Sequence, residues 1–360
     1  MKIIFALFIV FNLTSAYASS TTLEWEPLKE GGKIHIVAPS SGPAGTEAYL
    51  NASITFLKEN GFVAEVRNGL IVPQTLGYAN TLAYRQKHLK DVLFDENVDI
   101  VWALRGGRGA SEVIMPLEDL PAPLKLKLIL GFSDTTAVHL LAAKWGWPSL
   151  HCPVLAYHEK GAHTVNKNTS LQPVFDILLG KTQEVNYTLK PLNSIAQKYQ
   201  GTISSQIRGG NASVIQRSIG TPTHLKTSRR ILFLEDIGEP ATKFLEIMTH
   251  FQRARLLKKV DAIILGDFES GLTGDQPSAL RVAKDEFLED MTKLNIPVLG
   301  SAEFGHGNLN YPLPFGTPAE LDFRGINEDK LRVSATVDFQ GENEVKLRVS
   351  ATGLPLKETK

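Results

Sequence analysis

The chain has 360 residues, of which 43% are hydrophobic, and its 38 basic residues balance 38 acidic ones. This length is enough for two domains of about 100–200 residues each, and the composition can fill sizeable cores. Because the formal charge is zero and no long basic run occurs, the electrostatic pattern of proteins that bind nucleic acid or anionic membranes is missing. We therefore expect a small substrate that is held in a pocket.

The first 18 residues have the pattern of a signal peptide. Lys2 gives a short positive start, residues 3–13 form an apolar run, and Ala16 and Ala18 flank Tyr17 in the way that signal peptidase accepts. The apolar run is shorter than the roughly 20 residues that a membrane span needs. We therefore predict a periplasmic protein without stable membrane insertion. A buried N-terminal helix is the alternative.

From residue 33 to about residue 160, short apolar runs alternate with amphipathic stretches. The predicted strands lie at 33–39, 62–66, 98–104 and 126–131. The predicted helices lie at 47–60, 84–94 and 135–145. Strands that alternate with helices indicate parallel pairing, with helices on both faces of the sheet. The sequence thus predicts an α/β domain over residues 19–160.

The rest of the chain divides less clearly. Residues 161–205 are polar and weakly periodic, which predicts a linker with one helix at 171–179. A second domain is expected at 206–360. Its clearest elements are strands at 230–234, 262–265 and 297–299 and a helix at 243–257. Near the end, the segment Lys330–Thr336 recurs unchanged as Lys346–Thr352, and its alternating pattern predicts a two-stranded ribbon.

Cysteine and metal chemistry play little part in this sequence. Cys152 is the only cysteine, so no intramolecular disulfide can form. The sequence has no HExxH motif, no clustered cysteines and no close group of histidine and aspartate residues. We therefore expect no metal and no other cofactor.

A serine lies between the fourth predicted strand and the helix that follows it, in the segment Leu128–Thr136. A sharp strand-to-helix turn exposes its central side chain, and the helix N-terminus offers free N–H groups to a developing oxyanion. Gly131 relieves crowding in such a turn, and Ser133 is then a candidate nucleophile. The alternative is that Ser133 only caps the helix, because Ser, Asp and Thr are preferred caps.

A glycine-rich loop, Arg105–Gly109, follows the third predicted strand. Its glycines let the backbone approach a ligand closely or adopt positive φ angles. The loop matches neither the phosphate-binding P-loop nor the dinucleotide fingerprint. Its N–H groups could supply the second half of an oxyanion hole, and a structural turn is the alternative.

Two further residues stand out in the second half of the chain. Glu235 directly follows an apolar strand, where a carboxylate is costly unless it is paired. A histidine that must become imidazolium is a natural partner for it, although an N-cap role, which Asp236 could fill equally well, is the alternative. His306 lies between Gly305 and Gly307, which is typical of a loop tip with an accessible imidazole.

The order and spacing of these motifs resemble those of the LD-carboxypeptidase family, also called muramoyltetrapeptide carboxypeptidases. The resemblance runs from about Lys33 to Asp322. It implies a Rossmann-like N-terminal domain with a parallel sheet, a C-terminal domain with a barrel-like sheet, and an active site between them. It also implies a serine peptidase that removes the terminal D-alanine from muropeptide tetrapeptides and that usually forms a homodimer.

The same resemblance implies roles for individual residues. The catalytic triad would be Ser133, Glu235 and His306, and the oxyanion hole would consist of the backbone N–H groups of Asp134 and Gly107. The residues expected to bind substrate are Arg105, Gly106, Arg108 and Asn211. Two positions depart from the family pattern, because Arg108 stands where a tyrosine is usual and Cys152 where a glycine is expected.

Two other functions stay open at this point. A microcin-immunity hydrolase of the same fold would cleave peptidyl-nucleotides and tends to place an aromatic side chain in the linker loop, where this sequence offers Tyr157 and Tyr187 but no tryptophan. A non-catalytic periplasmic binding protein would also fit two α/β lobes and a signal peptide.

Overall fold

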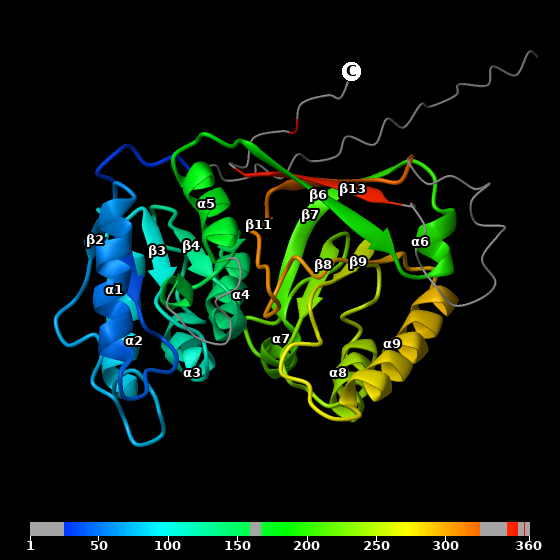
Figure 1. Ribbon diagram of the computed structural model, residues 1–360, viewed down its shortest axis with the longest axis horizontal. Coiled ribbons are helices and arrows are strands. Elements are labelled where there is room, and N and C mark those ends of the chain that lie inside the picture. Colours follow the sequence, from blue (N-terminus) through cyan, green and yellow to red (C-terminus); the bar gives the residue numbers. More distant parts are fainter. Residues whose placement is uncertain (1–24, 159–166, 325–343, 352–355, 357–360) are drawn as a thin grey trace, which may run out of the picture.

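The computed structural model describes residues 25–158, 167–324, 344–351 and 356. They form two domains that lie side by side, an α/β domain and a β-barrel (Figure 1). The predicted signal peptide lies outside the described residues. Among the helices that are described, none is both long and apolar enough to cross a membrane.

The N-terminal domain is built on a six-stranded sheet with the order β11-β5-β4-β3-β1-β2. Strands β1 to β5 run parallel to one another, and β11 joins the edge antiparallel to β5. Every residue of β3 and β4 is buried, as expected for strands covered on both faces. The strands are β1 Lys33–Val37, β2 Val63–Glu65, β3 Ile100–Ala103, β4 Leu128–Gly131, β5 Ser149–His151 and β11 Leu313–Phe315.

Helices connect these strands as the alternating pattern predicts. The α/β class and the parallel sheet predicted for this domain are confirmed. The connecting helices are α1 Thr46–Glu59, α2 Leu82–Phe94, α3 Ala110–Ile114, α4 Thr136–Lys144 and α5 Lys167–Leu178, with short 3₁₀ turns η1 Met115–Leu117, η2 Ser133–Thr135 and η3 Leu155–His158.

The C-terminal domain is a closed barrel with the strand order β10-β6-β13-β12-β7-β8-β9, which confirms the expected barrel-like sheet. Strands β7 to β10 are parallel, whereas β12, β13 and β6 pair antiparallel. The strands are β6 Glu184–Pro191, β7 Thr202–Asn211, β8 Ile231–Glu235, β9 Ala262–Leu265, β10 Val298–Gly300, β12 Pro318–Asp322 and β13 Val345–Ser350. The helices are α6 Ser194–Lys198, α7 Ala212–Ser218, α8 Ala241–Arg253 and α9 Gln276–Lys293.

The segment 161–205 differs from the linker that its polarity suggests. Its second half contains β6, which pairs with β10 and β13 inside the barrel. The linker prediction is therefore wrong there, because one face of β6 is polar and its alternation is weak. The second copy of the repeated segment forms most of β13 between β6 and β12. The first copy, and with it the predicted ribbon, lies outside the described residues.

One of the hydrophobic clusters extends across both domains. Trp102 of β3 and Phe175 of α5 pack edge to face, with ring centroids 6.0 Å apart. Phe315 of β11 lies 6.0 Å from Phe233 of β8, so a strand of the first sheet packs on the wall of the barrel. This packing holds the carboxyl ends of β4 and β8 in a fixed relative position.

Candidate active site

Ser133 lies on a strained turn at the carboxyl end of β4. Phe132 is extended, and Ser133 then adopts a φ of 60°, which is uncommon for a residue other than glycine. Gly131 is required here, because a Cβ at this position would lie 2.9 Å from the Thr135 side chain. The helical turns η2 and α4 follow at once. Strain of this kind is typical of functional sites, and the turn leaves the Ser133 side chain partly exposed.

The glycine-rich loop after β3 packs directly against this serine. A Cβ added to Gly106 would lie 3.0 Å from Ser133 Oγ and 3.8 Å from the backbone nitrogen of Asp134. Gly107 has a φ of 116° and instead packs against Ser41, whose Oγ accepts a hydrogen bond from the N–H of Arg108. The structure therefore places the glycine loop beside the serine, with Gly106 as its nearest residue.

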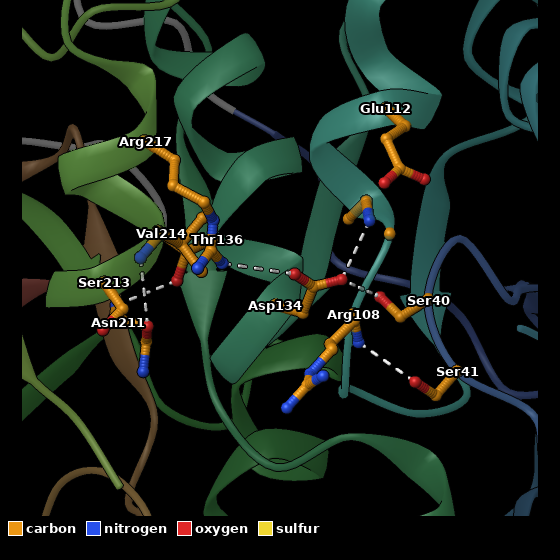
Figure 2. A network of polar contacts seen from close by, with 12 residues as sticks. Ser40, Ser41, Arg108, Glu112, Asp134, Thr136, Asn211, Ser213, Val214 and Arg217 are labelled. Atoms are coloured by element: carbon orange, nitrogen blue, oxygen red, sulfur yellow. Dashed lines mark hydrogen bonds and ion pairs between the residues drawn. The ribbon is translucent and has the colours of Figure 1, made fainter. Parts of the chain in front are cut away.

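The Asp134 side chain connects the turn at Ser133 to neighbouring segments of both domains. Its buried carboxylate accepts hydrogen bonds from Ser40 Oγ at 2.7 Å and from the backbone N–H of Ala110 at 2.8 Å (Figure 2). A guanidinium nitrogen of Arg217, on α7 of the second domain, lies 3.9 Å from the other carboxylate oxygen. The side chain of Asp134 thus positions the turn through contacts with three other segments.

Glu235 and His306 form a close pair at the end of β8. The Nδ1 atom of His306 lies 2.6 Å from Oε2 of Glu235, and the carboxylate is fully buried. Gly305 permits this approach, because it has a φ of 111° and a Cβ there would lie 3.0 Å from the same oxygen. The His306 ring also contacts Phe132, with centroids 4.6 Å apart, which brings the pair beside Ser133.

The electrostatics of the pair favour an imidazole that binds a proton readily. Burial alone would lower the pKa of His306, but the negative charge of Glu235 and its hydrogen bond outweigh burial, so the pKa is raised above 6.5. Burial raises the pKa of Glu235, and the charge of His306 opposes that rise. Between Ser133 Oγ and His306 no hydrogen bond forms within the described residues, as is common before substrate binds.

Asn211 joins three elements of the site. Its backbone N–H donates to Thr136 Oγ1 at 3.0 Å, and its side-chain Nδ2 donates to Asp236 Oδ1 at 2.8 Å. Its Oδ1 accepts from the N–H of Val214 and so caps α7 (Figure 2). The structure thus gives Asn211 a positioning role that the sequence does not reveal. Its contact with substrate stays a prediction.

The remaining predicted residues lie around the glycine loop. Arg105 is partly exposed and Arg108 is exposed, and neither side chain pairs with a carboxylate within the described part of the chain. Cys152 is fully buried, and burial raises the pKa of its thiol, so the thiol is inert. Within the same residues, no group of three or more His, Cys, Asp or Glu side chains could hold a metal ion.

Comparison with known proteins identifies the family of the chain. The profile of the LD-carboxypeptidase N-terminal domain matches residues 34–152, and that of the C-terminal domain matches residues 204–321. A carboxypeptidase homologue of Rickettsia conorii is 33% identical over 325 residues, which covers 89% of this chain and 96% of that protein. The murein tetrapeptide carboxypeptidase of Pseudomonas aeruginosa is 26% identical over 323 residues, or 86% of this chain and 98% of that protein.

The fold agrees as well. The crystal structure of a muramoyltetrapeptide carboxypeptidase from Oxalobacter formigenes matches with a TM-score of 0.66 at 22% identity, over 88% of this chain and 99% of that chain. Both domain profiles, in the expected order, together match more than half of the chain. The chain therefore belongs to the LD-carboxypeptidase family.

Proposed function

We propose that the protein is a serine carboxypeptidase that removes the terminal D-alanine from muropeptide tetrapeptides, with Ser133, His306 and Glu235 as its catalytic triad. One observation carries the proposal. The His306–Glu235 pair lies beside the strained turn at Ser133, because the imidazole packs against the neighbouring Phe132. Membership of the family supports peptidase chemistry.

The proposed mechanism begins at the imidazole. Glu235 holds the proton on Nδ1 of His306, so Nε2 is free to take the proton of Ser133. The serine oxygen attacks the scissile carbonyl, and the tetrahedral intermediate collapses when the amine of D-alanine leaves with the proton from His306. Water then attacks the acyl-enzyme, again with His306 as base, and releases the shortened peptide and free Ser133.

The oxyanion of the intermediate needs two donors near Ser133. In this proposal they are the backbone N–H groups of Asp134, at the start of the helical turn, and of Gly107 in the glycine loop. The loop contacts Ser133 through Gly106, which supports their convergence. Loss of one such donor typically costs about 10²–10³ in rate.

The substrate of a carboxypeptidase ends in a free carboxylate. Arg105 and Arg108 border the glycine loop, and within the described residues neither guanidinium is neutralised by an acidic side chain. Arginine binds carboxylates through two parallel hydrogen bonds. We therefore assign recognition of the terminal carboxylate to these two residues, with Gly106 forming the floor beneath the scissile bond.

Mass spectrometry of a muropeptide tetrapeptide incubated with the purified protein tests the proposal. Loss of one alanine mass is the expected result, and the tripeptide product should not be shortened further. A matched tetrapeptide with an amidated C-terminus should be cleaved much more slowly, because its terminal charge is gone. An unchanged free-acid tetrapeptide would refute the proposed activity.

Gly106→Ala is expected to lower kcat/KM by about 10²-fold, because small displacements at a reacting centre have effects of this size. The added methyl group would lie 2.9 Å from Ser133 Cβ and 3.0 Å from its Oγ, and so would push the nucleophile aside. Gly106 has no positive φ, so its backbone tolerates alanine. Steady-state kinetics beside thermal melting would check this, and unchanged kinetics would show that the loop does not restrain Ser133.

The microcin-immunity alternative loses support from the position of its candidate aromatic residue, and the binding-protein alternative loses support from the fold. Tyr187 lies in β6, and its hydroxyl donates to the carbonyl of Pro312, so it is not a loop residue that could stack on a base. Tyr157 lies in η3. The second domain is a closed barrel rather than the second α/β lobe of a periplasmic binding protein. The same mass spectrometry with a peptidyl-nucleotide would detect the microcin-immunity activity directly.

We also propose that the protein acts in the periplasm, where it would meet peptidoglycan fragments. The support is the signal-peptide pattern of residues 1–18. N-terminal sequencing of protein from the periplasmic fraction should begin after Ala18, and unprocessed protein found only in the cytosol would contradict the proposal. The homodimer expected from the family resemblance stays a prediction, which light scattering of the purified protein tests.

A further inference from the structure

A cavity of about 430 Å³ lies between the two domains, lined by none of the residues assigned to catalysis above. The C-terminal end of α4 forms its wall on the N-terminal domain. On the barrel side it is lined by β7, by the loop 222–226 and by the residue that precedes β8. The cavity is hereafter called the basic cavity, because five basic residues line it, namely Lys144, Arg208, His224, Lys226 and Arg230.

No acidic residue is found in the described lining of the basic cavity. The carboxylate of Glu118 accepts a hydrogen bond from the lining residue Thr223 but does not itself line the cavity. Within the described residues, neither Arg208 nor Lys226 forms an ion pair, and the Arg230 guanidinium donates a hydrogen bond to the backbone carbonyl of Arg229. The cavity therefore concentrates positive charge without internal neutralisation.

Arg208 is the unusual member of this group. Its side chain belongs to a residue that is only 8% exposed, and its Nη1 donates to the carbonyl of Trp147 at 3.0 Å. A guanidinium has five donors, and a buried charge without a counter-charge is costly. Burial, and then the charge of Arg230, lower the pKa of Arg208 to about 10.

Two further features show that the cavity is built around this guanidinium. Gly316 makes room for it, since a Cβ there would lie 2.4 Å from Nη2 of Arg208. The Nδ1 atom of His224 is buried and has no hydrogen-bond partner in the described part of the chain. The lining therefore presents guanidinium N–H groups and an imidazole nitrogen that no group in the described residues satisfies.

We propose that the basic cavity binds a small anion with two or more negative charges, a phosphate or polycarboxylate group, with Arg208 as its central ligand. Guanidinium groups bind both kinds of oxyanion through paired, charge-assisted hydrogen bonds. The bound anion offsets the repulsion between Arg208 and Arg230. It also contacts both domains, because Lys144 belongs to α4 and Arg208 to β7.

Calorimetric titration of the mature protein with inorganic phosphate, and separately with citrate, tests this proposal at constant ionic strength. We expect saturable binding of at least one of them at a single site, with a rise in melting temperature of about 2–4 °C or more near saturation. Arg208→Met should weaken binding about tenfold or more, because a hydrogen bond to a charged group is lost. The two titrations distinguish a phosphate site from a polycarboxylate site.

Arg281→Met is the matched control, because it removes the same charge from an exposed position on α9 and should leave binding unchanged. The double variant Lys226→Gln, Arg230→Gln keeps the test decisive if Arg208→Met does not fold, and it should weaken binding several-fold. Binding of neither anion by the wild type would overturn the proposal. So would undiminished binding by these cavity variants, or binding that is lost instead in Arg105→Gln.

Discussion

Ser133→Ala is expected to reduce kcat for release of D-alanine by about 10⁶-fold, the size of loss that follows removal of a serine nucleophile. In the proposed mechanism the Ser133 hydroxyl forms the acyl-enzyme, and alanine at this position leaves no nucleophile beside Gly106. Mass spectrometry of the tripeptide product over long incubations would measure the residual rate.

A second variant at the same position separates chemistry from folding. Because Ser133 has a φ of 60°, glycine adopts this backbone conformation more easily than alanine does. Ser133→Gly should therefore be inactive yet more stable than Ser133→Ala, by about 1 kcal/mol in the free energy of unfolding. Activity of either variant within tenfold of the wild type would remove Ser133 from the mechanism.

Glu235→Gln is expected to lower kcat by about 10⁴-fold at neutral pH, because an amide can hold the imidazole in the wrong tautomer. The carboxylate accepts a hydrogen bond from Nδ1 of His306 at 2.6 Å, which leaves Nε2 as the base in the proposed mechanism. Glu246→Gln makes the same chemical change at an exposed site on α8 and should leave kcat unaltered. Equal loss in both variants would point to a general effect of charge.

The pH dependence of kcat/KM tests the His306–Glu235 pair independently. Burial lowers the pKa of His306, but Glu235 raises it by more, so the net shift is upward from 6.5. Since only neutral His306 acts as a base, kcat/KM should rise with pH through a pKa above 6.5. In Glu235→Gln burial remains and the charge is gone, so this rise should move to lower pH.

The same shift predicts the direction of a stability effect. A group whose pKa is raised in the folded state stabilises that state fully below its unfolded pKa. For His306 the contribution is therefore present below about pH 6.5 and is lost as pH rises through the folded pKa. In the Glu235→Gln variant this loss of stability with rising pH should not occur, because the charge that raises the pKa of His306 is gone.

The local pattern of the sequence predicts the turn at Ser133 well. A continuous apolar run ends in Gly131, and cap residues follow it, so both the buried strand β4 and the helix α4 can be read from neighbours in the chain. Burial and the flanking glycines mark Glu235 and His306 only separately, and these residues lie 71 positions apart. Their pairing was an expectation from the family resemblance, because no local pattern connects two residues so distant in the chain.

Other features of the fold and the site depend on contacts between distant residues, which no local sequence pattern predicts. The β11 segment Leu313–Phe315 has three residues with a central proline, which argues against a strand in any reading of the sequence alone. Arg208 looks like an ordinary outward-facing charge in β7, and only the approach of Gly316 and Trp147 reveals its burial. The structural hydrogen bonds of Asn211 likewise arise from three separate elements.

The position of β11 has a consequence for how the chain is made. The strand that covers the edge of β5 is synthesised only after most of the barrel, although the other five strands of its sheet are complete by His151. A nascent or proteolysed chain that ends near residue 158 therefore carries an uncapped β5, whose free backbone N–H and C=O groups invite pairing with another chain. Self-association of such fragments is therefore expected from the topology. In the intact chain, β11 prevents it by covering the edge of β5.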